Sequence, residues 1–211
     1  MIREFRIADL FTLGNGFSGA AAMLAFMRFL IDGGVGYFWV GTAFLPLALA
    51  MDILDGRIAR RLHMSSPFGQ ELDSLADAVS FGVAPAAMAF AAGMRGGWDA
   101  VCLVVFVGCG ISRLARYNVT AESLADPDTA KVAYFEGVPI PSSLLLVLLL
   151  AVLAATGHWQ EALPLGAVTL GPFVFHPLAL VYLAHGTRRH LPVTVRCAGV
   201  RGLGRLIHSM I

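Results

Sequence analysis

The residues best suited to chemistry are four aspartates between Met51 and Asp77, in a chain that is otherwise very apolar. They form two pairs, Asp52 with Asp55 and Asp73 with Asp77. At about 100° per residue, helical positions three or four apart share a face. Small residues share these two faces: Gly56 and Ala59 on the first, Gly69, Ala76 and Ser80 on the second. Acidic residues are costly in an apolar chain, so the spacing predicts a pocket with carboxylates on its floor.

Four carboxylates brought together repel one another, by about 3 kcal/mol for a pair at 5 Å and an effective dielectric constant of 20. Either several are protonated, or divalent cations bind between them. Oxygen ligands on rigid helices suit Mg²⁺ or Mn²⁺ better than zinc. Two facing acidic pairs could hold two ions around a phosphoryl group in transfer, and one aspartate could accept a proton from an attacking alcohol. The alternative is ion pairing with Arg57, Arg60 and Arg61; four acids interleaved with glycine and alanine favour the metal site.

The composition is that of a membrane protein. The chain has 211 residues, of which 57% are hydrophobic and 14% charged, with a mean hydropathy of +0.74. Soluble domains have about 25% charged residues, so we predict an all-α membrane protein with six transmembrane helices. The first ten residues mix apolar and charged side chains, which predicts an interfacial amphipathic segment instead of a cleavable signal. The three cysteines form no CxxC motif and are expected to be reduced thiols.

Six apolar segments are the predicted spans: residues 11–31, 37–62, 68–93, 98–118, 138–156 and 162–184. They form one membrane domain, 1–185, followed by a basic tail, 186–211, which either binds anionic headgroups or only sets topology. The second span would be about 39 Å long, more than the bilayer core, so its C-terminal acids should lie near the membrane surface. Ser66 and Pro67 predict the start of the third helix, as N-cap and first helical residue.

The positive charges fix the expected orientation. Of the 15 lysine and arginine residues, all but Arg28 and Arg95 fall on one side of this arrangement. The side that is rich in lysine and arginine faces the cytoplasm. We therefore expect a multi-pass protein of the cytoplasmic membrane, with both termini and all four aspartates on the cytoplasmic face.

The acidic motif resembles a known family signature. Its full form is Asp52-x2-Asp55-Gly56-x2-Ala59-Arg60-x8-Gly69-x3-Asp73-x3-Asp77, and it is similar to that of the CDP-alcohol phosphatidyltransferases at every defined position. The resemblance implies that the four aspartates ligate two Mg²⁺ or Mn²⁺ ions and that Asp77 is also the general base. It implies that Gly56, Ala59, Arg60 and Gly69 form the nucleotide site for CDP-diacylglycerol. It also implies six membrane helices, a cytosol-facing site and a homodimer.

Flanking blocks suggest the acceptor alcohol. Residues 12–15, 73–85, 112–119 and 134–141 resemble the phosphatidylserine synthase branch of the family, which implies serine. The implied acceptor residues are Asn15, Ser65, Arg113, Arg116, Asn118, Gly137 and Pro139. The two arginines could bind the serine carboxylate or the donor diphosphate; alternatively they only anchor the helix at the cytoplasmic surface. Asp9 departs from the family, which usually has asparagine there.

We therefore expect transfer of the phosphatidyl group from CDP-diacylglycerol to serine, with CMP released. A sister enzyme using glycerol 3-phosphate or inositol phosphate is the first alternative. A cation transporter is the second, although transporters usually have repeated halves and midplane sites. The expected partners are the two substrates, membrane lipids and a second copy of the chain; no nucleic acid partner is expected.

Overall fold

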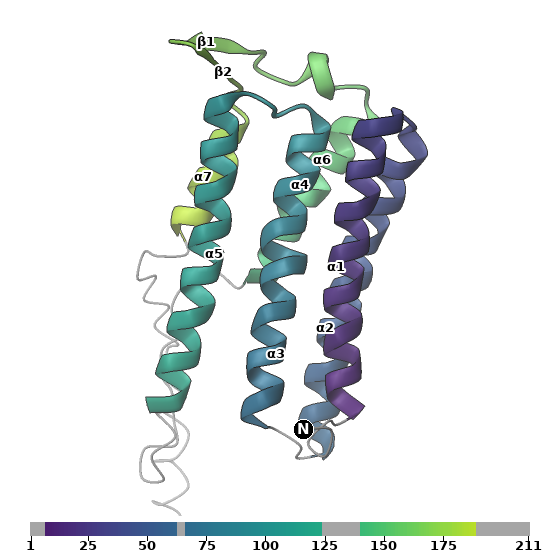
Figure 1. Cartoon of the computed structure of the whole chain (residues 1–211), viewed down its shortest axis with the longest axis vertical. Coiled ribbons are helices and arrows are strands. Elements are labelled where there is room, and N and C mark those ends of the chain that lie inside the picture. The colour runs from purple at the N-terminus through teal and green to yellow at the C-terminus, as the bar shows by residue number, and fades with distance from the viewer. Residues whose placement is uncertain (1–6, 63–65, 124–139, 189–211) are drawn as a thin grey trace, which may run out of the picture.

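The computed structural model describes residues 7–62, 66–123 and 140–188 and is almost entirely helical (Figure 1). Its elements, in chain order, are α1 (Ile7–Asp32), α2 (Val35–Leu62), α3 (Pro67–Asp77), the π-helix η2 (Ala78–Val83), α4 (Ala84–Ala92), α5 (Gly97–Ser123), the 3-10 helix η3 (Ile140–Ser143), α6 (Leu144–Ala155), the 3-10 helix η4 (Gln160–Ala162), β1 (Val168–Leu170), β2 (Phe173–Phe175) and α7 (Ala179–Arg188). Residues 7–10 of the predicted amphipathic segment belong to α1, and residues 1–6 lie outside the described residues, as does the predicted basic tail after Arg188.

The first four predicted spans are confirmed as helices. Four helical segments are long and apolar enough to cross a membrane: Ala8–Asp32, Val35–Ala59, Phe68–Ala92 and Gly97–Val119. The chain is therefore membrane-embedded. The fifth predicted span corresponds to η3 and α6, a shorter apolar helix at Ile140–Ala155. The described residues thus contain four such spans, and six is not confirmed.

The predicted continuous helix over 162–184 is wrong. This segment contains η4, a two-stranded antiparallel hairpin in which Val168 pairs with Phe175, and only then α7. Gly171, with φ +65°, and Pro172 form the hairpin loop; glycine suits the first position of a two-residue hairpin turn. Apolar content alone does not distinguish a strand from a helix, so turn residues decide this segment.

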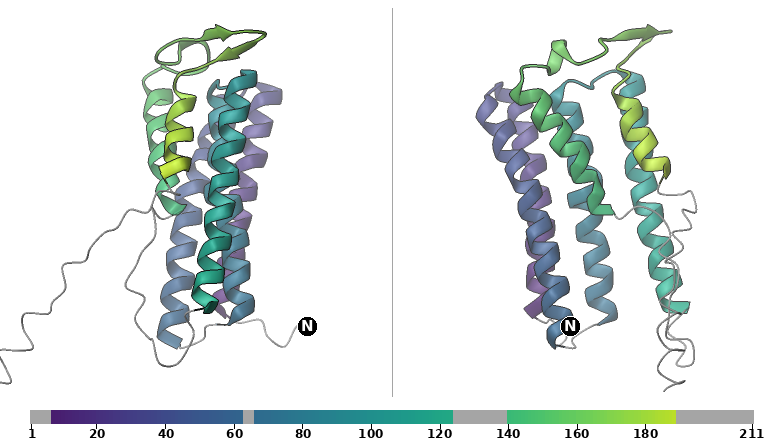
Figure 2. Two further views of the ribbon diagram at one scale, coloured as in Figure 1. Left: turned by 90° about the vertical axis from the view of Figure 1, so that its left-hand side faces the viewer. Right: turned by 180° about the vertical axis from the view of Figure 1, so that it is seen from behind.

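The helices form a bundle with two different ends. At one end, which we call the site end, lie the start of α1, the end of α2, the start of α3 and the end of α5 (Figure 1). The opposite end, the hairpin end, holds β1 and β2. Figure 2 shows α6 and α7 only in the half of the bundle nearer the hairpin. Around the site end, the described bundle therefore consists of α1, α2, α3 and α5.

The core lies mainly toward the hairpin end, where aromatic rings join α1 and α2 to the segment after α6. The ring of Trp159 stacks on Phe29 at 5.5 Å and lies 5.0 Å from the ring of Phe38. Helices α1 and α2 approach closely because Gly41 has no side chain: a Cβ there would lie 2.7 Å from the ring of Phe26. Small residues permit such close helix packing in membranes.

The third span consists of three consecutive helical segments, α3, η2 and α4. Its start is as predicted, because the hydroxyl of Ser66 accepts a hydrogen bond from the Gly69 N–H at 3.0 Å and Pro67 is the first helical residue. After Asp77 the helix widens to the π form, and the N–H of Ala84 bonds to the carbonyl of Val79, five residues back. Pro85 follows, and a proline ring clashes with the carbonyl four positions before it in an α-helix. The wider turn relieves that clash.

Candidate active site

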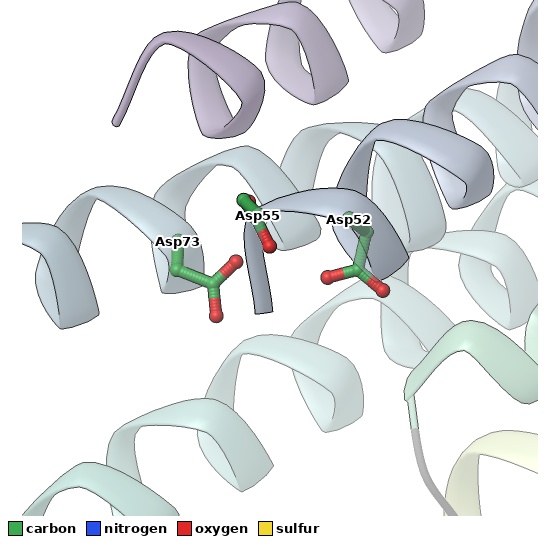
Figure 3. A group of neighbouring side chains, drawn as sticks. All are labelled: Asp52, Asp55 and Asp73. Carbon is green, nitrogen blue, oxygen red and sulfur yellow. The ribbon is translucent and has the colours of Figure 1, made fainter. Parts of the chain in front are cut away.

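Three of the four aspartates meet at the site end. Asp52 and Asp55 lie near the end of α2, and Asp73 lies on α3. One carboxylate oxygen from each lies within 4.8 Å of the others. Figure 3 shows the three carboxylates turned toward a shared space between the two helices. The predicted grouping of acids from two antiparallel helices is therefore seen for these three.

The oxygens of this group fit a hard cation. Oδ2 of Asp55 and Oδ1 of Asp73 are buried and have no hydrogen-bond partner among the described residues. Buried polar atoms are normally partnered, and carboxylate oxygens are the ligands that Mg²⁺ and Mn²⁺ prefer. Within the described part of the chain, no arginine forms an ion pair with any of the four aspartates. The side chains of Arg57 and Arg61 are exposed, and that of Arg60 lies outside the description.

Asp77 lies outside this group of three and has a different environment. It is buried at the end of α3, one helical turn from Asp73. Its Oδ1 accepts a hydrogen bond of 3.0 Å from the side-chain amide of Asn15 on α1. Asn15 itself is fully buried. Asp77 is thus held by a neighbouring helix, whereas Asp55 and Asp73 retain unpartnered oxygens.

A cavity of about 340 Å³ connects the acids to α5. Its walls include Asp73 and Asp77 on one side and Arg113 and Asn118 on the other. The Nε of Arg113 is buried and has no hydrogen-bond partner among the described residues. A guanidinium in the wall of a cavity favours an anionic guest. The cavity therefore offers carboxylates and a cation to the same small molecule.

Hydrogen bonds fix Asn118 in the wall of this cavity. Its amide donates to the hydroxyl of Ser74 at 3.0 Å and to Oε1 of Glu71 at 3.3 Å. These contacts join α5 to α3 beside the site. The arrangement leaves space for a small polar molecule between the carboxylates of α3 and the guanidinium of Arg113.

The other predicted site residues divide into three groups. Gly56 and Ala59 lie on α2 after Asp55, and Gly69 lies on α3, where a Cβ would approach Oδ1 of the buried Asp9 to 3.0 Å. Arg116 is exposed and does not line the cavity, and neither does Asn15. Ser65, Gly137 and Pro139 lie outside the described residues.

Some cavity residues were not among the predicted site residues. They are Gln70, Ser74, Leu114, Tyr117, Ile140 and Pro141. Ser74 and Tyr117 are each one position from a predicted residue. Gln70 lies one helical turn before Asp73, so the helical spacing could have predicted that it shares the face of the acids. Ile140 and Pro141 come from η3 and lie in the block 134–141, whose resemblance to the phosphatidylserine synthase branch was the signal for them.

Comparison with known proteins defines the class. The family model for CDP-alcohol phosphatidyltransferase matches residues 5–182. The chain belongs to this family. The matched range includes all four aspartates and every described residue of the cavity.

Curated relatives share a more specific name. A Saccharomyces cerevisiae protein named CDP-diacylglycerol--serine O-phosphatidyltransferase is 45% identical over 188 residues, covering 88% of this chain and 68% of the relative. Helicobacter pylori and Bacillus subtilis proteins of the same name are 36% and 31% identical, covering 74% and 68% of this chain. The matches cover 63% of the Helicobacter pylori protein and 74% of the Bacillus subtilis protein.

Proposed function

We propose that this protein transfers the phosphatidyl group of CDP-diacylglycerol to the hydroxyl of serine, releasing CMP. The observation that carries the proposal is the cavity in which Asp73 and Asp77 face Arg113. An acceptor with both a hydroxyl and a carboxylate matches this combination. The printed names of the relatives support the same reaction.

The donor is proposed to bind through its diphosphate and nucleotide. Asp52, Asp55 and Asp73 would hold Mg²⁺ or Mn²⁺, with Asp77 completing the ligand set for a second ion. When bound, such ions offset the negative charge of the phosphate oxygens in an in-line displacement. Gly56, Ala59, Arg60 and Gly69 are proposed to form the cytidine nucleotide site, where small residues leave room for the ligand.

The acceptor is proposed to bind in the cavity. The guanidinium of Arg113 binds the serine carboxylate, which places the hydroxyl toward Asp77. Asp77 takes the hydroxyl proton, and the serine oxygen bonds to the phosphorus that bears the diacylglycerol. The bond from that phosphorus to the bridging oxygen breaks, and CMP leaves with the bond's electron pair.

We also propose the cellular arrangement. The site end faces the cytoplasm, as do both termini, because the positive charges favour that orientation. Soluble serine then reaches the cavity from the cytosol, while the donor arrives through the lipid. The active unit is proposed to be a homodimer in the cytoplasmic membrane.

The decisive experiment is CMP release by the purified protein from CDP-diacylglycerol with Mn²⁺ or Mg²⁺. Serine, glycerol 3-phosphate and inositol phosphate are offered separately. Release with serine alone is the expected result. Release only with another alcohol would refute the serine assignment, and no release with any acceptor would refute transferase activity altogether.

A second experiment addresses the base. Asp77→Asn is expected to retain nucleotide binding but to lose turnover by about 100-fold or more, the usual contribution of general base catalysis. Binding is measured with a fluorescent CDP-diacylglycerol analogue and turnover by CMP release. Normal turnover of this variant would show that another group accepts the proton.

A further inference from the structure

Asn15 makes a specific contact with Asp77. Asn15 is fully buried in the first half of α1. Its Nδ2 donates a hydrogen bond of 3.0 Å to Oδ1 of Asp77, which is 62 positions away in the sequence. An amide NH₂ only donates, and a carboxylate only accepts. The contact therefore defines which atom of each group faces the other. Asn15 does not line the cavity, whereas Asp77 does.

The backbone of Asn15 is fixed by the same helix that contains Asp77. The hydroxyl of Ser80, in the π-helix η2, donates to the carbonyl of Asn15 at 2.9 Å. Ser80 is fully buried. This second hydrogen bond connects α1 and the third span one turn beyond the first. Asn15 is thus held at its backbone while its side chain holds Asp77.

Two glycines permit this close approach. A Cβ on Gly16 would lie 3.5 Å from Cβ of Ala76, in ordinary contact, and one on Gly19 would collide with Ser80. The short distance between α1 and the third span is therefore set by α1 itself. Because the spacing is small, the short side chain of Asn15 reaches the carboxylate directly.

We propose that Asn15 is a positioning residue for Asp77. It fixes one carboxylate oxygen, so that the other is presented to the acceptor hydroxyl in the cavity. This inference rests on the proposed function, in which Asp77 accepts the hydroxyl proton. It gives Asn15 a role in aiming the base and none in contacting the acceptor.

The test is a double-mutant cycle between Asn15→Leu and Asp77→Asn. Leucine has the same branching at Cγ as asparagine, although it is larger, and it removes the donor. In the wild-type background, Asn15→Leu is expected to lower kcat by about 30-fold or more, within the range that a general base contributes. In the Asp77→Asn background it should lower kcat less than about twofold, because residues that act as a unit are not additive.

Three further measurements separate positioning from other roles. The KM for CDP-diacylglycerol should change by less than about threefold in Asn15→Leu. The same limit applies to the Kd of the Mn²⁺ ion proposed to bind Asp52, Asp55 and Asp73, measured by isothermal titration without substrate. Thermal unfolding reports whether the variant is folded. If Asn15→Leu yields no folded protein, Asn15→Ala removes the same donor with a smaller side chain.

Ser18→Ala is the matched control, since Ser18 is also buried on α1 but donates to the carbonyl of Gly14 within its own helix. It should retain wild-type kcat. Equal losses of kcat by Asn15→Leu in both backgrounds, or a parallel loss of the Mn²⁺ ion proposed to bind Asp52, Asp55 and Asp73, would overturn the positioning role. Normal turnover by Asn15→Leu overturns only this inference, whereas a wild-type protein that releases no CMP overturns the proposed function as well.

Discussion

Arg113 provides the positive charge in the described wall of the cavity, and its Nε lacks a partner among the described residues. A guanidinium binds a carboxylate through two parallel hydrogen bonds, which glutamine cannot reproduce. Arg113→Gln is therefore expected to raise the KM for serine by about 10-fold or more, while the KM for CDP-diacylglycerol stays near the wild-type value. CMP release at varied serine concentration measures both.

Arg116→Gln is the matched comparison on the same helix. Arg116 is exposed and does not line the cavity, so its substitution should change the KM for serine by less than about twofold. Similar KM increases for the two variants would mean that the carboxylate is attracted by overall positive charge and not by Arg113.

Asp73 contributes a buried oxygen without a partner to the acidic group. Removing one ligand from a site for a hard cation weakens binding. Asp73→Asn is expected to raise the Kd for Mn²⁺ by about 10-fold or more, measured by isothermal titration. Asp32→Asn is the control, because Asp32 is an acid at the hairpin end that pairs with Arg28. The Kd of the Asp32→Asn variant for Mn²⁺ should equal that of the wild type. Equal affinities for the two variants would place the ion elsewhere.

At the scale of elements, the contact between α1 and the third span depends on Gly19. An added methyl would collide with Ser80, whereas a Cβ on Gly108 of α5 meets no atom within 4 Å. Gly19→Ala is expected to destabilise the protein by about 1–3 kcal/mol, as overpacking does. Gly108→Ala should be neutral or slightly stabilising, because alanine favours the helix. Thermal unfolding, monitored by circular dichroism, distinguishes the two variants. Equal melting temperatures would show that α1 and the third span can move apart without a loss of stability.

The β-hairpin is joined to α5 through Asp99. This carboxyl is fully buried and accepts hydrogen bonds from the N–H of Gly96 at 2.9 Å and of His176 at 2.7 Å, and its Oδ2 lies 2.6 Å from the His176 ring. Asp99→Ala leaves these buried groups without partners, at a cost of about 1–3 kcal/mol for each donor.

The expected result for Asp99→Ala is faster proteolysis within 160–178, measured by mass spectrometry of a limited digest. Thr169→Ala is the control, because Thr169 is exposed on the hairpin. Unchanged cleavage in Asp99→Ala would mean that the hairpin is held by the packing of Trp98 against Phe173.

For the molecule as a whole, orientation follows from charge. Arg57 and Arg61 lie near the end of α2, and Arg113 and Arg116 lie in the last part of α5, both at the site end. Arg28 lies near the end of α1 and Arg95 lies between α4 and α5, toward the hairpin end. With the native cysteines replaced by alanine, a membrane-impermeant maleimide applied to intact cells should label Thr169→Cys. It should label Arg61→Cys only after permeabilisation, and the reverse pattern would contradict a cytoplasmic site.

The long helices and the acidic group could be predicted from the sequence, but the rotation of each helix about its own axis could not. Four spans and the cap at Ser66 follow from local apolar runs and turn residues, and each aspartate pair follows from helical periodicity. Which neighbour each residue faces depends on tertiary packing. Asn15 therefore contacts Asp77 and not the cavity, and only Arg113 of the two arginines lines it. The hairpin was missed because its residues are as apolar as those of a span.

The π-helix between Asp77 and Ala84 has a consequence for comparing relatives. A π turn contains one residue more than the α turn it replaces, so a relative without it would lack one residue inside this span. An alignment would show that difference as a single-residue gap in a membrane helix, where gaps are usually treated as errors. Such a gap would instead mark the wider turn, which takes up the extra residue so that the acidic half of the span and the half toward the hairpin keep nearly the same faces.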